Sequence, residues 1–152
     1  MEFAEKEVST KTKNNQVIQY QRPSGPFVGV SWMSLFLGVT TFIIGLWNAK
    51  TMVLNEKRYY FETLMYGLFS VISIQKSVRD KLEGIPVTEL YYGLSWVSTF
   101  IAVTLLIIGL WNADLSLSEK GFYGMSFILS LFSTIAVQKN TRDTKSFSYE
   151  ER

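Results

Sequence analysis

The chain carries one sequence pattern twice, and this repeat limits the folds open to it more than any other feature. The run Ile-Gly-Leu-Trp-Asn-Ala at 44–49 returns unchanged at 108–113, 64 residues later. Shorter matches follow in the same order through the rest of each copy. Each copy spans two apolar stretches, so we expect the repeat unit to be a membrane hairpin of two helices.

Long uncharged windows locate these helices. Three windows contain no charged residue: those between Arg22 and Lys50, between Glu89 and Asp114, and between Lys120 and Lys139. A membrane-spanning helix needs about 20 largely apolar residues, and these windows meet or approach that length. A fourth window is interrupted by Glu62 and is assigned as a span because its repeat partner is one. A soluble four-helix bundle would instead need a polar stripe along each helix.

The sequence therefore predicts an all-α membrane protein. Its four transmembrane helices form two tandem helical hairpins that run the same way through the membrane, with spans at 28–47, 59–75, 92–111 and 121–138. The expected divisions are a flexible cytoplasmic N-terminal tail at 1–27, a first two-helix transmembrane repeat at 28–82, a cytoplasmic linker at 83–91, a second repeat at 92–143 and a cytoplasmic C-terminal tail at 144–152.

The distribution of lysine and arginine predicts the orientation. Eleven of these residues fall in the two tails and the central linker, and four fall in the two hairpin loops. Basic residues accumulate on the cytoplasmic side of a membrane. We therefore expect a multi-pass protein with both termini in the cytoplasm.

The composition excludes several kinds of chemistry. The chain has no cysteine and no histidine, so thiol nucleophiles, disulfides, imidazole catalysis and most transition-metal sites are ruled out. The net charge of +2 gives no reason to expect a nucleic-acid partner. We expect no cofactor, no metal site and no catalytic residue, and hence not an enzyme.

The repeated polar and aromatic residues have a structural interpretation as anchors and helix stops. They are Trp47, Asn48, Glu56, Lys57, Gln75, Lys76, Arg79, Asp80, Trp111, Asn112, Glu119, Lys120, Gln138, Lys139, Arg142 and Asp143. Tryptophan prefers the membrane interface, and asparagine tolerates the left-handed conformation that closes a helix. A ligand contact at the Trp-Asn pair is the alternative.

The start of the second helix in each copy holds capping residues. Asn55 and Ser118 occupy equivalent positions and are favoured N-caps, and Ser116 with Glu119 would also form a capping box. Glu56 and Glu119 then lie in the first turn, where negative charge suits the helix dipole.

The other end of these helices is basic. Lys76 and Asp80 are four residues apart and can pair on one helix face, as can their counterparts Lys139 and Asp143. Arg79 and Arg142 are expected near the helix C-terminus, where positive charge suits the dipole and anionic headgroups. A docking surface for a cytoplasmic partner is the alternative interpretation.

Two further features concern the interior of the membrane. Ser34, Gly38, Thr41 and Gly45 share one helix face, and such small residues let helices approach closely in lipid. Their packing partner, in this chain or another, stays open. Glu62 is an intramembrane candidate carboxylate; it either pairs with Arg58, four residues before it on the preceding turn, or has a functional role such as carrying a proton.

The repeated motifs resemble the bacterial YiaA/YiaB inner-membrane family, built on the YiaAB two-helix domain. The resemblance covers about 28–143 and is carried by Gly-Leu-Trp-Asn-Ala at 45–49 and 109–113, Glu-Lys at 56–57 and 119–120, Gln-Lys at 75–76 and 138–139, and Arg-Asp at 79–80 and 142–143. With two copies of the domain, the chain is more similar to the YiaA branch than to a single-copy member. The resemblance implies a bacterial cell inner membrane location and four spans, and brings no known activity or catalytic residue.

These observations favour a non-enzymatic integral membrane protein that acts as a structural, accessory or stress-linked component. The alternative is a small oligomeric channel or transporter, supported by Glu62 and the serine and threonine content of the spans. The expected partners are the lipid bilayer and either further copies of the chain or another membrane protein. A membrane enzyme using Asp80 and Asp143 is the least favoured interpretation.

Overall fold

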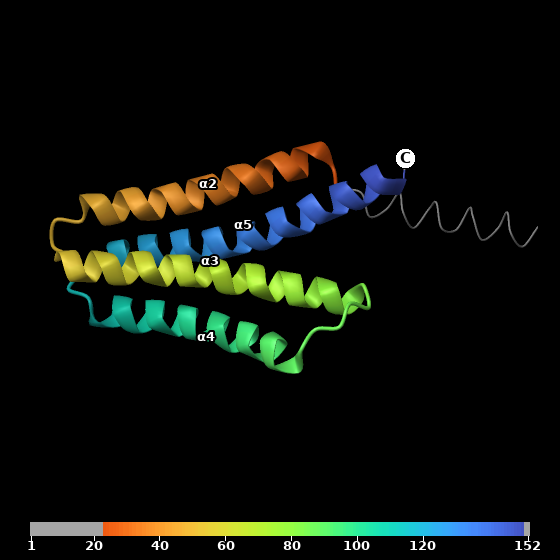
Figure 1. The fold of residues 1–152 in the computed structure, drawn as a ribbon. Coiled ribbons are helices and arrows are strands. Elements are labelled where there is room, and N and C mark those ends of the chain that lie inside the picture. Colours follow the sequence, from red (N-terminus) through yellow and green to blue (C-terminus); the bar gives the residue numbers. More distant parts are fainter. Residues whose placement is uncertain (1–22, 151–152) are drawn as a thin grey trace, which may run out of the picture.

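Four long helices make up the described part of the chain. The computed structural model describes the backbone of residues 23–150 and the side chains of residues 23–144. The helices are α2 (Gly25–Asn48), α3 (Leu54–Leu82), α4 (Glu89–Asn112) and α5 (Leu117–Glu150) (Figure 1). This all-helical architecture with four helices confirms the predicted all-α fold. The predicted flexible tail lies, for residues 1–22, outside the described residues.

The helices run alternately up and down. The loops at 49–53 and 113–116 lie at one end of the bundle, which we call the Trp-Asn end because α2 and α4 finish there in Trp-Asn (Figure 1). The linker at 83–88 lies at the opposite end, which we call the basic end. Among the described residues, α2, α4 and the Leu117–Thr144 part of α5 are long and apolar enough to cross a membrane.

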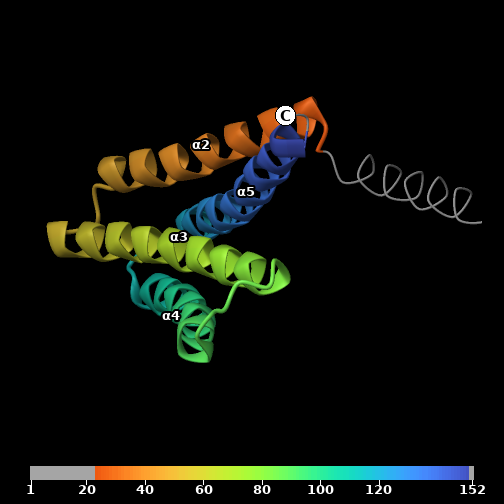
Figure 2. The same cartoon turned by 45° about the vertical axis from the view of Figure 1, so that its right-hand side comes forward.

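The helices of one repeat do not pair mainly with each other. Instead α2 packs on α5, α4 packs on α3, and α3 and α5 lie against each other between them (Figures 1 and 2). The contacts between α2 and α3, and between α4 and α5, are much less extensive. The first helix of each repeat is therefore seated on the second helix of the other repeat, and the two repeats share one core.

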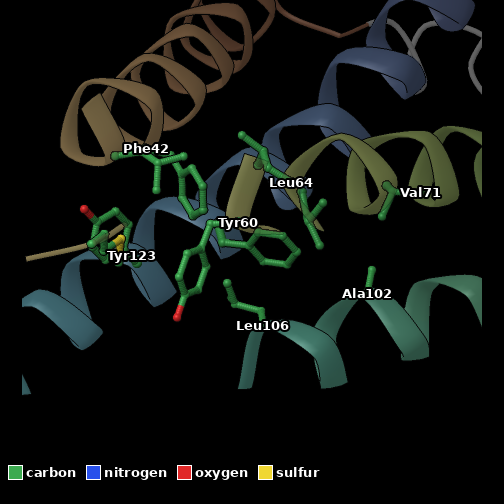
Figure 3. Close-up of a cluster of buried hydrophobic side chains, with 11 residues drawn as sticks. Phe42, Tyr60, Leu64, Val71, Ala102, Leu106 and Tyr123 are labelled. Atoms are coloured by element: carbon green, nitrogen blue, oxygen red, sulfur yellow. The ribbon is translucent and has the colours of Figure 1, made fainter. Parts of the chain in front are cut away.

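The core joins all four helices. It consists of Phe42, Leu46, Met52, Tyr60, Leu64, Val71, Ala102, Leu106, Tyr123, Phe127 and Leu131. In Figure 3, Tyr60 and Leu64 of α3 lie between Phe42 of α2 and the α4 residues Ala102 and Leu106. α3, the helix whose composition is least typical of a span, thus lies at the centre of the bundle.

The outer surface is apolar, opposite to a soluble bundle. Met33 and Phe36 on α2 are largely exposed, as is Phe100 on α4. Water would make such a surface unfavourable, whereas lipid tails solvate it. The distribution of exposed apolar side chains therefore identifies the outer faces of α2 and α4 as lipid-facing.

The predicted small-residue face packs within the same chain. A Cβ atom placed on Gly38 would lie 2.7 Å from the Ser130 hydroxyl oxygen and 3.0 Å from the Ser130 backbone nitrogen. A Cβ on Gly45 would lie 2.5 Å from the ring of Phe122. The face therefore seats α2 on α5, because the absence of side chains there allows the two backbones to approach closely.

The two copies end differently at the basic end. α3 stops in a Schellman motif, in which the N–H of Ile85 donates to the carbonyl of Asp80 and the N–H of Gly84 donates to that of Lys81. Gly84 has a φ of 73°, a left-handed conformation that favours glycine. The equivalent position in the second copy is Phe147. α5 continues to Glu150, through residues predicted as the C-terminal tail.

Candidate functional site

At the Trp-Asn end, α2 and α4 finish with the same set of hydrogen bonds, one set in each copy of the repeat. The Asn48 side-chain amide donates to the carbonyl of Ile44 at 3.0 Å, and Asn112 does the same to Ile108 at 2.9 Å. Among the described residues, none other than glycine has a positive φ. The expectation that asparagine closes the helix in the left-handed conformation is therefore wrong. Asparagine instead bonds back to the last turn of its own helix.

The repeated lysines complete these closures. Lys57 Nζ donates to the carbonyl oxygen of Trp47 at 3.1 Å, and Lys120 Nζ reaches that of Trp111 at 3.4 Å. The last carbonyls of a helix have no partner within the helix, so each lysine bonds an otherwise unsatisfied acceptor. The same lysine-to-backbone bond is therefore formed in both copies.

Each N-cap lies two residues before the predicted Asn55 and Ser118. α3 is capped at Val53, whose N–H donates to Glu56 Oε2 at 2.9 Å. At the start of α5 the N–H and hydroxyl of Ser116 both donate to Glu119 Oε2, and the Glu119 N–H donates to the Ser116 hydroxyl. The capping box is therefore the correct alternative for the second copy, and the Asn55 and Ser118 caps are wrong.

The repeated tryptophans lie on the outside of the bundle at this end. Trp47 is 83% exposed and Trp111 is 82% exposed. An indole ring on a lipid-facing helix end suits the headgroup region. Each repeated residue at the Trp-Asn end thus either anchors a helix in the interface or bonds a helix terminus.

The basic end holds a polar cavity that is lined by residues of both copies. Its volume is about 140 Å³, and it lies between α3 and α5. The polar lining residues are Gln75, Lys76 and Arg79 of α3, and Gln138, Lys139 and Arg142 of α5. α3 and α5 diverge toward this end (Figure 2), which opens the space between them. The sequence singled out all six residues but did not indicate that they meet.

The aspartates of this region pair with the neighbouring arginines. Arg79 Nη2 lies 2.8 Å from Asp80 Oδ1, and Arg142 Nε lies 2.9 Å from Asp143 Oδ1. Among the ion pairs of the described residues, each of these aspartates pairs with the arginine next to it, and the predicted pairs with Lys76 and Lys139 are not present. Arg142 also lies inside α5 rather than near its C-terminus, so the dipole argument applies to Arg79 alone.

Lys76 and Lys139 contribute the uncompensated charge of the cavity. Both side chains are exposed, and in the described part of the chain neither takes part in an ion pair. The Glu83 carboxylate lies 4.0 Å from Arg79 Nε, and Glu89 pairs with Lys81 at 2.8 Å. Among the residues whose side chains are described, five cations and four carboxylates therefore lie at this end, and the two lysines leave the cavity lining positive.

Glu62 lies outside both sites. Its side chain is exposed on the surface of α3, and within residues 23–144 it forms no ion pair with Arg58. Its repeat counterpart Met125 is also exposed. The two positions share the outer face of the bundle, away from the shared core.

One buried polar contact was not anticipated. The Asn140 side-chain amide donates to the Ser31 hydroxyl at 3.0 Å, and Asn140 is 1% exposed. This hydrogen bond joins α5 to α2. The corresponding pair in the other half is Ser77 and Ser95, whose hydroxyls donate within their own helices, to Ser73 and Tyr91. The signal in the sequence is the departure from repeat symmetry, Asn140 against Ser77.

The fold and these two ends define an integral membrane protein of four helices, built from two interlocked copies of a two-helix unit. The sequence matches the yiaA/B two helix domain family at residues 27–80 and again at 91–143. The chain belongs to this family and is an inner membrane protein.

Two relatives are similar to this chain. Inner membrane protein YiaA of Escherichia coli strain K12 is 55% identical over 130 residues, which cover 86% of this chain and 87% of that protein. Membrane protein YubF of Bacillus subtilis strain 168 is 36% identical over 63 residues, which cover 41% of this chain and 72% of that protein. No solved structure matches the chain.

Proposed function

We propose that this protein is a non-enzymatic structural or accessory component of the inner membrane. The observation that carries the proposal is that the repeated residues at the Trp-Asn end serve helix closure, capping or anchoring. Asn48 and Lys57 bond the end of α2, and Glu56 caps the start of α3. The second copy repeats each of these bonds, so the repeated sequence specifies a scaffold.

The buried hydroxyls support the same proposal. Ser70 and Ser130 donate to carbonyls four residues earlier in their own helices, as Thr63 and Thr134 do. Hydroxyls that are satisfied in this way favour close helix packing over a water-filled path. The serine and threonine content of the spans therefore lends more support to a packed scaffold than to a channel.

The proposed topology has four membrane passes with both termini in the cytoplasm. The cavity-lining basic residues would then face the cytoplasm and the exposed Trp47 and Trp111 rings the opposite interface. The lysine and arginine distribution supports this orientation.

The test is extraction of the full chain from native membranes in a mild detergent, followed by native mass spectrometry. We expect a second, different membrane protein in fixed stoichiometry, or a defined complex of identical chains that conducts no solute. Solute flux in reconstituted vesicles above that of empty vesicles would contradict the scaffold and favour the oligomeric channel. Turnover of any added substrate by the purified chain would contradict the non-enzymatic role.

A further inference from the structure

We propose that the cavity between α3 and α5 at the basic end binds a phosphate group. The proposal needs only that the chain spans the membrane and does not depend on the scaffold role. Its lining repeats the same three side-chain types from two sides: glutamine, lysine and arginine at 75, 76 and 79, and again at 138, 139 and 142.

Each of the six polar lining side chains carries hydrogen-bond donors, and Ile72 supplies the apolar part of the lining. A lysine ammonium offers three N–H donors and an arginine guanidinium five, with no acceptor on either group. Asp80 accepts two bonds from Arg79, from Nε at 3.0 Å and Nη2 at 2.8 Å, which holds the guanidinium in place and leaves further N–H groups on it. Several donors that converge from two helices suit a group with several charged oxygens, and phosphate is such a group.

The charge of the cavity also favours an anionic ligand. Lys76 and Lys139 approach it from opposite helices, and neither is neutralised by an ion pair among the described residues. Two lysine charges at one cavity repel each other, and an anion bound between them would offset this repulsion. Arg79 and Arg142 are each paired with the aspartate next to them, so among the described residues the two lysines carry the positive charge that an incoming anion would meet.

The position of the cavity along the helices matches a headgroup. α3 starts at Leu54 and α5 at Leu117, so Lys76 and Lys139 each come 22 residues after the helix start. At 1.5 Å per residue this is about 33 Å, close to the thickness of a bilayer hydrocarbon core. With the helix starts at one interface, the cavity lies at the other, among lipid phosphates.

The experiment compares two phospholipids: phosphatidylglycerol, which is anionic, and phosphatidylcholine, whose phosphate is balanced by its own choline cation. The full chain is reconstituted with equal amounts of phosphatidylglycerol and phosphatidylcholine of the same acyl chains, extracted, and weighed with its retained lipid by native mass spectrometry. We expect phosphatidylglycerol to be retained in preference, and the preference to fall about 10- to 30-fold in the K76Q/K139Q variant, from the loss of two basic residues at an anionic surface.

The control variants separate a built site from general attraction. K50Q/R58Q removes two exposed positive charges near the Trp-Asn end and should keep the preference. K76R/K139R keeps the charge and should also keep it. Equal loss in K76Q/K139Q and K50Q/R58Q, or no loss in either, would overturn the proposal; a matching α-helical circular dichroism spectrum excludes misfolding as the cause.

A second arm identifies the source of the phosphate. Sodium phosphate is titrated into the lipid-bound protein against sodium chloride of equal ionic strength. Retention of lipid throughout assigns the site to lipid headgroups, and specific displacement by phosphate assigns it to the free anion; both support phosphate binding. Displacement by poly-glutamate but not by phosphate would overturn the proposal in favour of an acidic protein segment.

Discussion

Tyr60 and Tyr123 stack on each other with ring centroids 6.1 Å apart and an angle of 16° between their planes. They occupy the same position in the two copies of the repeat. Equivalent residues can meet only on the axis that relates the copies. The basic cavity also brings equivalent residues together, so this axis runs along the contact between α3 and α5 from the tyrosine pair to the cavity.

The first helix of each copy packs on the second helix of the other copy. The contact between α2 and α5 therefore tests this packing arrangement. A methyl group at Gly38 would meet the backbone of Ser130, which cannot rotate away. We expect Gly38→Ala to lower the free energy of unfolding by about 1–3 kcal/mol, as overpacking does. Denaturation of the purified protein from mild detergent into dodecyl sulfate, followed by circular dichroism, measures this quantity.

Gly29 offers the matched control for that substitution. It lies on the same helix, and a Cβ there would meet nothing within 4 Å. Gly29→Ala should leave stability unchanged or raise it, since alanine is the better helix former. Equal destabilisation by the two substitutions would show that α2 does not pack on α5 through this face.

The Asn140–Ser31 hydrogen bond makes a second prediction about the same pair of helices. A double-mutant cycle of Asn140→Ala and Ser31→Ala should give a coupling energy of about 0.6–1.7 kcal/mol, the range for such bonds between membrane helices. The control cycle uses Ser77→Ala and Ser95→Ala at the equivalent positions. It should give a coupling near zero, since each hydroxyl bonds its own helix. A larger value in the control cycle would contradict the assigned bonding.

The repeat and the uncharged windows were enough to predict four helices and their approximate ends. Periodicity and composition act within a helix, so they located the small-residue face of Gly38 and Gly45 correctly. They could not choose its partner, because α3 and α5 carry equivalent residues: Gly67 and Ser130 stand at matching positions. Only the packed structure selects α5 for α2.

The cavity shows the same limit at the level of the site. Lys76 and Arg79 were identified as a basic end from their place in the repeat, and so were Lys139 and Arg142. Their spacing within each helix does not indicate that residues 63 positions apart line the same cavity. The four-residue spacing predicted that Asp80 pairs with Lys76, but it does not account for how far each side chain can extend. Asp80 pairs with the adjacent Arg79 instead.

The two capping arrangements differ enough to be compared directly. Ser116 and Glu119 bond each other reciprocally, whereas Val53 offers Glu56 only its backbone N–H. We expect Glu119→Ala to speed amide exchange in the first turn of α5 more than Glu56→Ala does in the first turn of α3. Hydrogen–deuterium exchange with peptide-level mass spectrometry measures both. Equal effects would mean that the serine hydroxyl adds nothing to the cap.

A substitution at the exposed Glu62 tests whether this carboxylate has a functional role or is only tolerated. Its counterpart Met125 shares the outer face, so Glu62→Met copies one repeat into the other at a lipid-facing position. We expect unchanged or higher stability, because a carboxylate in the membrane is unfavourable. The unfolding assay used for Gly38 measures this. A lower stability would reveal a partner for Glu62, and lost proton or solute flux with intact stability would restore a functional role.

The absence of cysteine from the chain allows its orientation to be tested one residue at a time. Thr51 lies in the exposed loop after α2, and Thr88 lies in the exposed linker before α4. With both termini in the cytoplasm, a membrane-impermeant thiol reagent should label Thr51→Cys in intact spheroplasts and Thr88→Cys only after permeabilisation. Asp114→Cys, in the second hairpin loop, should behave as Thr51→Cys does, because both loops lie at the Trp-Asn end. The reverse pattern would invert the protein and place the basic cavity on the outer side. Opposite labelling of the two hairpin loops would contradict four passes altogether.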